Sequence, residues 1–423
     1  MYPTDSKKER VFLTGIIPPG VLREEVEESV DELALLAESA GAEVHGRFYQ
    51  SLKGYDPAYF IGKGKAAQIA EKIQGSGVDT VIFDDDLTPA QVKNLGTIIN
   101  KKIIDRTGLI LEIFAQNART KEAKTQVELA QLQYMLPRLT RQWKHLERQI
   151  GGIGVRAGMG ETQLEVDRRL VRTRIKKLKE DLKSIENQRA VRRKRRGQLF
   201  KATLIGYTNA GKSTLFNALT PLSGTEILVA DRLFATLDST VRRLQLEDHQ
   251  VMLLADTVGF IRKLPHSLIA SFRSTFGVVQ DADLLLNVVD VSHSNYEEHI
   301  KAVKNVLKEM NLDTKPVVNV FNKIDLVKDG TVIQDVKQRY PDAVFVSALR
   351  GIGLRNVISV VSAAASARFQ IKEFTLPIHD SRNIARLFNC GEVLVQTYNG
   401  GYTSLKVRLS LENAAKLSDL NNA

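Results

Sequence analysis

The sequence Gly206-Tyr207-Thr208-Asn209-Ala210-Gly211-Lys212-Ser213-Thr214 decides how the middle of this chain folds. It matches the pattern G-x-x-x-x-G-K-[ST] and stands between a β-rich run, 200–205, and a helical pattern that begins at Leu215. The two glycines let the backbone curl around a phosphate with its N–H groups pointing inward, and the following helix adds its positive dipole end. The stretch therefore predicts a nucleotide-binding loop between a strand and a helix.

Three side chains of this loop have roles that follow from their chemistry. Lys212 is expected to bridge the β- and γ-phosphates, and Ser213 is expected to ligate Mg²⁺. The side-chain oxygen of Asn209 is placed to help hold a monovalent cation near the phosphates. We therefore expect hydrolysis to be faster in K⁺ than in Na⁺, and we count Lys212 and Asn209 as catalytic.

A second motif, Asp256-Thr257-Val258-Gly259, ends a β-rich run, 251–255. Its carboxylate can hold a water bound to Mg²⁺, and the Gly259 N–H can meet the γ-phosphate, so Gly259 is also counted as catalytic. Phe260 follows, where a water-orienting Gln is often found. A phenyl ring forms no hydrogen bond to the attacking water, so we expect slow intrinsic turnover.

Two further motifs concern the base. Asn322-Lys323-Ile324-Asp325 stands at a strand end, where a carboxylate accepts hydrogen bonds from N1–H and the 2-amino group of guanine. Adenine presents an acceptor at N1 instead, so the site selects GTP over ATP. Ser347-Ala348 follows the last strand and fits the loop whose backbone amide meets guanine O6. Four motifs in this order at strand ends predict a GTPase.

A switch loop is expected between the phosphate loop and Asp256, in residues 231–238. Such a loop needs a Thr whose hydroxyl ligates Mg²⁺ and whose N–H meets the γ-phosphate, so that hydrolysis releases it. We predict Thr236 for this catalytic role, with Thr240 as the alternative, and include Phe234 and Ala235 among the residues that contact the nucleotide. The expected magnesium ligands are Ser213, Thr236 and Asp256.

The rest of the chain predicts an α/β protein with a helical insertion. Residues up to about 118, and again from about 199 to 366, alternate β-rich runs with helical patterns, which is typical of parallel sheets. The last part reads as strand, helix, hairpin and closing helix. The expected domains are an N-terminal α/β domain (1–118), a basic antiparallel helical hairpin (119–197), a P-loop GTPase domain (198–367) and a small α+β module (368–423).

The helical hairpin is predicted from two apolar seams that recur in steps of three and four. The first seam consists of Leu129, Leu132, Leu136, Leu139, Trp143, Leu146 and Ile150, and the second of Leu164, Val171, Ile175, Leu178, Leu182 and Ile185. Five glycines in 151–160 separate them, which no helix would tolerate. Because the apolar spacing continues across Pro137, we expect this proline to kink the first helix rather than end it.

The positive charge of the chain is concentrated in the same segment. Residues 119–197 hold 22 basic and 9 acidic residues, a net charge of +13, whereas the rest of the chain sums to −2. A basic segment on a near-neutral body indicates a polyanion binder, and a glycine-rich tip suits an RNA groove. The alternatives are a solvated basic face and a flexible turn.

Composition excludes several classes of protein. A lone cysteine, Cys390, excludes an intramolecular disulfide framework, and neither a secretory stretch nor a membrane-length apolar run is found. We expect a cytoplasmic protein, with peripheral membrane association left open, and a monomer.

Two features of the N-terminal part leave alternatives open. Ile61-Gly62-Lys63-Gly64-Lys65 precedes a helical pattern and is either a plain turn or a site for a phosphate of RNA or of a second nucleotide. Asp84-Asp85-Asp86 is expected to be a solvated strand end rather than a metal site, because consecutive carboxylates do not point to one spot.

These motifs together resemble the HflX GTPases. The resemblance covers residues 10–366 and rests on the phosphate loop, on 233–238, 256–261 and 322–325, and upstream on 105–107, 113–115, 119–123, 126–130, 136–139 and 160–165. The glycine loop departs from the family, since Arg156-Ala157-Gly158-Met159-Gly160-Glu161 stands where Arg-Gly-Pro-Gly-Glu is usual.

The resemblance implies an N-terminal α/β domain joined by a helical hairpin to a GTPase domain. It further implies binding to the large ribosomal subunit and its RNA, with splitting of stalled or idle ribosomes. One alternative is a GTPase that assists ribosome assembly or tRNA maturation. Another is an RNA remodeller with a second, ATP-hydrolysing site in the N-terminal domain.

Overall fold

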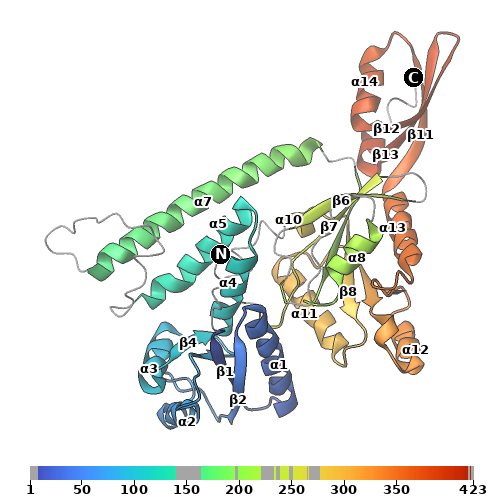
Figure 1. Cartoon of the computed structure of the whole chain (residues 1–423). Helices are drawn as coiled ribbons and strands as arrows, with labels where there is room; N and C mark the ends of the chain where they lie inside the picture. The colour runs from blue at the N-terminus through green and yellow to red at the C-terminus, as the bar shows by residue number, and fades with distance from the viewer. Residues whose placement is uncertain are drawn as a thin grey trace, which may run out of the picture. The chain divides into compact units, whose positions relative to one another are not determined.

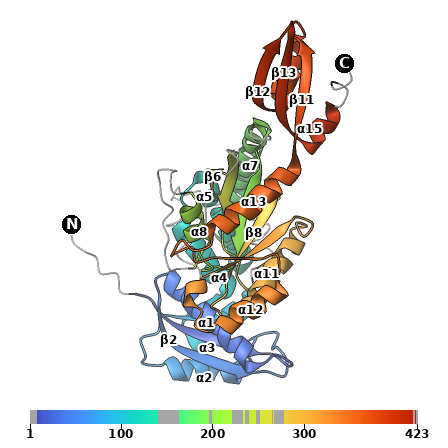
Figure 2. The same ribbon diagram turned by 90° about the vertical axis from the view of Figure 1, so that its right-hand side faces the viewer.

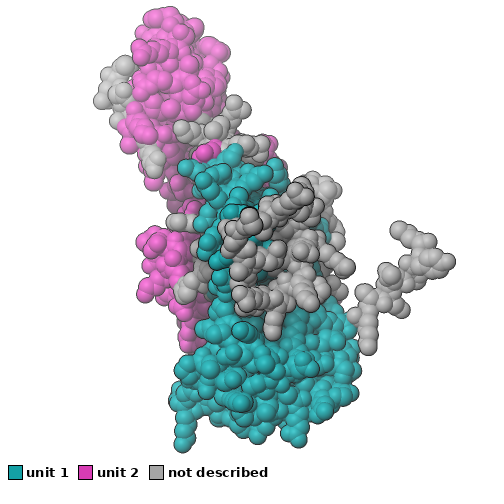
Figure 3. All heavy atoms as spheres, turned by 90° about the vertical axis from the view of Figure 1, so that its left-hand side faces the viewer, with its two compact units in different colours: residues 1–186, 228–238, 258–276 teal, residues 187–227, 239–257, 277–423 magenta. Residues whose placement is uncertain are grey.

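The computed structural model describes residues 8–139, 163–195, 199–220, 233–234, 239–246, 251–263, 265, 277–417 and 420 (Figure 1). The chain divides into two compact units, coloured separately in Figure 3. The first comprises Met1–Glu186, Leu228–Asp238 and Val258–Phe276, and the second comprises Asn187–Ile227, Ser239–Thr257 and Gly277–Ala423. The four-domain division expected from the sequence stays a prediction.

The first unit contains the predicted parallel sheet. Its four strands, in the order β2-β1-β3-β4, are all parallel. They are β1 (Arg10–Ile17), β2 (Glu43–Ser51), β3 (Thr80–Phe83) and β4 (Lys102–Asp105). Strand β2 was not predicted from the sequence, because its polar residues and internal Gly46 do not resemble a buried strand. A Cβ at Gly46 would lie 2.8 Å from the Phe12 ring, so a larger residue there would have to displace that ring.

Helices cover both faces of this sheet. Phe12 and Ile16 share one core cluster with residues of α2 (Lys63–Ile73) and α3 (Pro89–Ile99). Gly15 faces the opposite side, where a Cβ would meet Val26 and Val30 of α1 (Arg23–Ser39). Successive residues of a strand point to opposite faces, so α1 covers the face that α2 and α3 leave open. The fourth helix is α4 (Arg106–Asn117).

The described parts of the two seams pair as antiparallel helices, as predicted, whereas Trp143, Leu146 and Ile150 of the first seam lie outside the described residues. Leu129, Leu132 and Leu139 form one buried cluster with Val171 and Leu178. Arg174 pairs with Glu128 at 2.6 Å, and Arg168 donates to the Leu139 carbonyl at 3.1 Å, so the partners run in opposite directions. The helices are α5 (Lys121–Met135) and α7 (Gln163–Arg195). The glycine tip, 151–160, lies outside the described residues.

The prediction for Pro137 is wrong. Helix α5 ends at Met135, a 3₁₀ turn, η1 (Leu136–Arg138), follows, and Leu139 is extended. Proline lacks an N–H and its ring collides with the carbonyl four residues earlier, so the α-helix cannot continue through it. Leu139 nevertheless reaches the seam, because the 3₁₀ turn places it in the cluster with Val171 and Leu178.

The second unit is built on a six-stranded sheet in the order β10-β9-β8-β5-β7-β6. Its strands are β5 (Lys201–Gly206), β6 (Thr240–Gln245), β7 (Val251–Asp256), β8 (Leu284–Asp290), β9 (Val317–Asn322) and β10 (Val344–Phe345). All neighbours are parallel except β6, which is antiparallel to β7. The helices are α8 (Lys212–Leu219), α10 (Gly277–Gln280), α11 (Tyr296–Glu309), η2 (Ile324–Leu326), α12 (Gly330–Arg339) and α13 (Leu354–Arg368).

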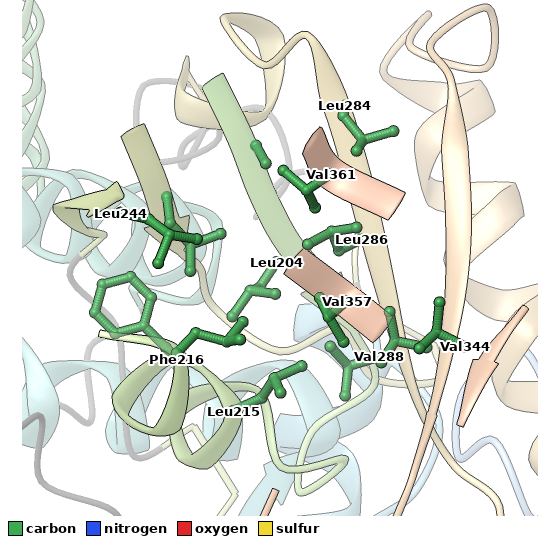
Figure 4. Close-up of a cluster of buried hydrophobic side chains, with 14 of the residues drawn as sticks. Leu204, Leu215, Phe216, Leu244, Leu284, Leu286, Val288, Val344, Val357 and Val361 are labelled. Carbon is green, nitrogen blue, oxygen red and sulfur yellow. The ribbon is translucent and has the colours of Figure 1, made fainter. Parts of the chain in front are cut away.

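The core of this sheet explains its hydrophobic strands. Leu204, Leu286 and Val288 of the central strands pack against Leu215 of α8 and Val357 of α13 (Figure 4). Strands buried on both faces need nearly continuous apolar residues, which is why β5 and β8 could be located from sequence.

The C-terminal module is a three-stranded antiparallel sheet in the order β11-β13-β12 (Figure 2). It consists of β11 (Phe369–Pro377), α14 (Ser381–Cys390), β12 (Gly391–Asn399), β13 (Tyr402–Ser410) and α15 (Leu411–Lys416). Gly400 and Gly401 join the hairpin at φ values of 55° and 91°, as a two-residue turn requires. Within the described ranges, no helix has the length and apolar character of a membrane span.

Candidate nucleotide-binding site

The phosphate loop lies at the carboxyl end of β5 and requires both of its glycines. Gly206 has a φ of 140°, and a Cβ there would lie 2.2 Å from the Val288 carbonyl oxygen. Gly211 has a φ of 89°, and its Cβ would lie 2.3 Å from Nδ2 of Asn322. Both positions combine a left-handed backbone with a close neighbour, so any side chain would displace the loop. Neighbouring strands β7, β8 and β9 bring the other motifs to the same edge of the sheet.

Lys212 is a buried cation at the start of α8. Its side chain is 6% exposed, and Nζ donates to the Tyr207 carbonyl oxygen at 2.6 Å. Burial lowers the pKa of Lys212 to about 8, although the negative charge of Asp256 opposes this shift. Among the described residues, no carboxylate forms a salt bridge with Lys212. An anionic ligand beside Nζ would supply the missing charge, as a nucleotide phosphate does.

Two predicted magnesium ligands lie together. Ser213 Oγ donates to Asp256 Oδ2 at 2.6 Å, and Asp256 is fully buried at the end of β7. Burial raises the pKa of Asp256, partly offset by the Ser213 hydrogen bond and the Lys212 charge. A hydroxyl and a carboxylate are the hard oxygen ligands that Mg²⁺ prefers, so this pair fits the ion.

Two threonines near the phosphate loop have different partners. Thr257 Oγ1 donates to the Leu204 carbonyl at 2.6 Å and so joins β7 to β5. Thr208 Oγ1 is buried, and the described part of the chain holds no hydrogen-bond partner for it. A buried hydroxyl without a partner is costly, so Thr208 is suited to contact a ligand in the loop. Asn209 is exposed, with a φ of 59°, and Ala210 is buried.

Asn322 connects the phosphate loop to the loop that follows β10. Its Nδ2 donates to the Ala210 carbonyl at 2.9 Å, and its Oδ1 accepts from the Ala348 N–H at 2.9 Å. Lys323 has a φ of 65° and pairs with Asp290 at 2.6 Å. Asp325 is exposed on η2, three residues after Asn322, and its contact with a guanine base stays a prediction.

An aromatic stack that was not predicted from the sequence includes Tyr207 of the phosphate loop. The rings of Tyr207 and His299 are nearly parallel, 3.9 Å apart, and His293 lies 4.6 Å from His299. His299 comes from α11, far away in sequence, and no local pattern marks it. The stack holds the residue whose carbonyl accepts from Lys212.

The predicted switch residues are only partly described. Ala235 and Thr236 lie outside the described residues. Phe234 is 3% exposed and packs edge to face against Phe114 of α4 in the first unit, with ring centroids 4.8 Å apart. Its side chain is therefore committed to that unit, and its contact with a nucleotide stays a prediction. Thr240, the alternative to Thr236, opens β6 opposite Asp256.

The structure places the remaining predicted residues as follows. Val258 and Gly259 come directly after Thr257 in the chain and belong to the first unit. Thr214, Ile324 and Ser347 lie with the phosphate loop, η2 and the end of β10 in the second unit. At Gly62 the backbone has a φ of 81° and begins α2, which suits a plain turn.

A buried phosphate-loop lysine, a serine paired with a strand-end aspartate and an Asn-Lys-x-Asp loop on one edge of a mostly parallel sheet define a P-loop GTPase. Residues 201–323 match the family described as 50S ribosome-binding GTPase. Residues 27–115 match the GTP-binding GTPase N-terminal family, and 117–196 the GTP-binding GTPase middle region.

This chain belongs to the HflX GTPase family, and it hydrolyses GTP. It is 43% identical over 413 residues to GTPase HflX of Magnetococcus marinus, covering 97% of this chain and 94% of that protein. It is 42% identical to GTPase HflX of Escherichia coli, covering 92% of each. A GTP-binding protein from Sulfolobus solfataricus, solved with GDP, is 24% identical with a TM-score of 0.43, over 85% of this chain and 99% of that one. The resemblance seen in the motifs is confirmed.

Proposed function

We propose that this GTPase binds the large ribosomal subunit in its GTP form and splits stalled or idle ribosomes in the cytoplasm. The observation that carries the proposal is its HflX membership, together with the match of 201–323 to the 50S ribosome-binding GTPases. A monomer with one nucleotide site is sufficient for this cycle.

The proposed chemistry is hydrolysis of the bond between the β- and γ-phosphates by water, which yields GDP and phosphate. Lys212 would lie against the β- and γ-phosphates, where its positive charge stabilises the charge that develops on them. Ser213, Asp256 and Thr236 would hold Mg²⁺, which when bound neutralises phosphate oxygens. The Gly259 N–H would meet the γ-phosphate, and Asp325 would accept from guanine.

Asn209 supports a second cofactor, K⁺. Its exposed side chain stands at the mouth of the phosphate loop with a left-handed backbone. A cation held there would stabilise charge between the phosphates during hydrolysis. We expect faster GTP hydrolysis in KCl than in NaCl, with this difference lost in Asn209→Ala. Equal rates in the two salts, with and without ribosomes, would remove K⁺ from the proposal.

The basic hairpin would supply the grip on ribosomal RNA. In the described part of α7, Val171 and Leu178 are buried, whereas Arg172, Lys176 and Lys179 are exposed. The apolar seam is thus used for packing and the cations face solvent, which is the arrangement that phosphate binding needs. The 151–160 tip would reach an RNA groove.

Co-sedimentation with separated ribosomal subunits tests the proposal. We expect the chain with a non-hydrolysable GTP analogue to pellet with the large subunit, and much less so with GDP. Lys212→Ala should lose this nucleotide dependence, and deletion of 151–160 should weaken binding in both states. Equal binding to both subunits, or no effect of nucleotide, would contradict it.

A role in ribosome assembly would use the same site, so a separate measurement is needed. Intact ribosomes are incubated with the chain and GTP, and subunits are resolved on a gradient. Separation into subunits supports splitting, whereas large-subunit binding without separation favours assembly. ATP hydrolysis that survives Lys212→Ala would point to the second site in the N-terminal part.

A further inference from the structure

The first unit contains a buried ion-pair network at the carboxyl end of β3. Asp84 is 1% exposed, accepts from Arg106 Nη1 at 2.6 Å and accepts from Ser29 Oγ at 2.7 Å. Arg106 is also 1% exposed and pairs in addition with Glu32. The expectation of a solvated strand end is therefore wrong for Asp84, because Arg106 from the next strand end covers it. In the described ranges, no three or more His, Cys, Asp or Glu side chains gather into a group suited to a metal ion.

Lys263 joins this network from the segment that follows Gly259. Its Nζ lies 2.6 Å from Asp84 Oδ2 and 2.7 Å from Asp85 Oδ1. All three residues belong to the same compact unit. The preceding residue, Arg262, pairs with Glu28 of α1 at 3.4 Å. Two successive cations thus hold one short segment.

Lys263 contacts two neighbouring negative charges, one of which is buried, and so differs from an ordinary surface ion pair. Asp84 and Asp85 are adjacent carboxylates, and Arg106 alone leaves their charge incompletely balanced. Although burial of Asp84 opposes ionisation, the charges of Arg106 and Lys263 hold its pKa below the usual range. Burial of Lys263 opposes its charge, but the two carboxylates outweigh this effect and raise the pKa of Lys263. The Lys263 side chain is 44% exposed whereas Asp84 is 1% exposed, so removing Lys263 leaves a buried carboxylate with less compensating charge.

The backbone between Gly259 and Lys263 has little freedom. Phe260 and Ile261 are 0% and 1% exposed, and Lys263 has a φ of 53°. A left-handed backbone at a residue with a side chain is unfavourable unless surrounding contacts hold it. Gly259 is four residues before Lys263 in the chain, and a shift of Lys263 would reach it through the buried Phe260 and Ile261.

We propose that Lys263 is a positioning residue for GTP hydrolysis, whose ion pairs with Asp84 and Asp85 hold the segment that carries Gly259 in the form that receives the γ-phosphate. This inference rests on the proposed contact between Gly259 and the γ-phosphate. A residue that favours one form changes the affinity only for ligands that distinguish the two forms. The anchor should therefore matter for GTP and not for GDP.

The test compares affinities of the full-length chain for a non-hydrolysable GTP analogue and for GDP. We expect Lys263→Ala to weaken the affinity for the GTP analogue by about five-fold and to leave the affinity for GDP unchanged. This is the size expected for a modest coupling between two contacts. Lys263→Arg keeps the charge and should restore most of the difference. Asp85→Asn leaves the Asp84–Arg106 pair intact and should show a smaller loss. Lys301→Ala removes a surface pair with Glu298, 2.8 Å long, and serves as the matched control.

Gly259→Ala separates the two ideas. If Gly259→Ala weakens the analogue but Lys263→Ala and Asp85→Asn leave the ratio of the two affinities unchanged, the anchor is overturned and the role of Gly259 stands. If Gly259→Ala has no effect either, the γ-phosphate contact itself is wrong. If Lys263→Ala instead increases the affinity for the analogue relative to that for GDP, the Lys263 ion pairs oppose the GTP form. That result also overturns the proposal.

Discussion

Asn322 donates to the carbonyl oxygen of Ala210 at 2.9 Å, so the loop that leads to Asp325 and the phosphate loop are directly hydrogen-bonded. The same side chain accepts from Ala348 at 2.9 Å. Three loops from different strands therefore depend on one buried amide. A substitution of Asn322 is therefore expected to weaken nucleotide binding although every residue predicted to contact the nucleotide through its side chain is kept.

Asn322→Ala is expected to weaken the affinities for both GTP and GDP by about ten-fold or more, because loss of a buried hydrogen bond costs about 1–3 kcal/mol. Titration with fluorescent nucleotides measures both affinities. The two affinities should fall together, because the substitution disturbs loops that hold either nucleotide and not a contact with the γ-phosphate. Unchanged affinity for GDP would show that the connection between loops is dispensable.

Nucleotide affinity should fall as pH rises through the pKa of Lys212, which burial lowers to about 8. The direction follows from the charge of Lys212. In the free protein Lys212 is a charged ammonium below this pKa and neutral above it, and phosphate binding needs the charged form. Bound phosphate raises the pKa again, so binding above pH 8 takes up a proton. Affinity is measured at several pH values on both sides of about 8. Lys212→Arg, which stays charged, should remove this dependence.

Gly211→Ala should abolish nucleotide binding, because its Cβ would lie 2.3 Å from Asn322 Nδ2 at a φ of 89°. The substitution combines backbone strain with loss of the loop geometry, so a decrease of roughly 1–3 kcal/mol in the free energy of unfolding is also expected. Gly330→Ala is the control, since nothing lies within 4 Å of its Cβ. Thermal melting and nucleotide titration are run on both variants, and equal behaviour would contradict the prediction.

Reversing the charges of Arg192, Arg193, Arg195 and Arg196 should weaken ribosome binding and reduce its dependence on salt. Each phosphate contact that is lost removes a released counterion, so the slope of log affinity against log salt becomes shallower. Binding is measured over a series of KCl concentrations in the GTP-analogue state. GTP hydrolysis without ribosomes should be unaffected. If binding and its slope are unchanged, the electrostatic part of the proposed function is wrong.

Much of the nucleotide site was predictable because its signals are local. Gly206, Gly211 and Lys212 have fixed spacing, and the loop must follow a strand and open a helix. Asp256 and Asn322 were located because buried parallel strands are continuous apolar runs that end where the polar residues begin. The carboxyl ends of such strands meet at one edge, which explains why distant motifs come together.

Other features could not be predicted from local sequence. The strand Glu43–Ser51 was missed because it is polar, and Pro137 was expected to kink a helix that in fact ends two residues earlier. Periodicity reports which residues face a partner, but Leu139 reaches the seam through a 3₁₀ turn as well as it would through an α-helix. The His299 stack on Tyr207 carries no sequence signal at all.

The amino-acid sequence alone determined the class of nucleotide, the strand ends that carry the nucleotide motifs and the concentration of positive charge in one segment of the chain. These follow from spacing, periodicity and composition, which need no knowledge of distant contacts. Only the tertiary structure decided that Asp84 is buried and that Lys263 and Arg106 share it. Ion pairs between residues far apart in the chain depend on how strands and loops pack, and a short sequence window contains no information about that packing.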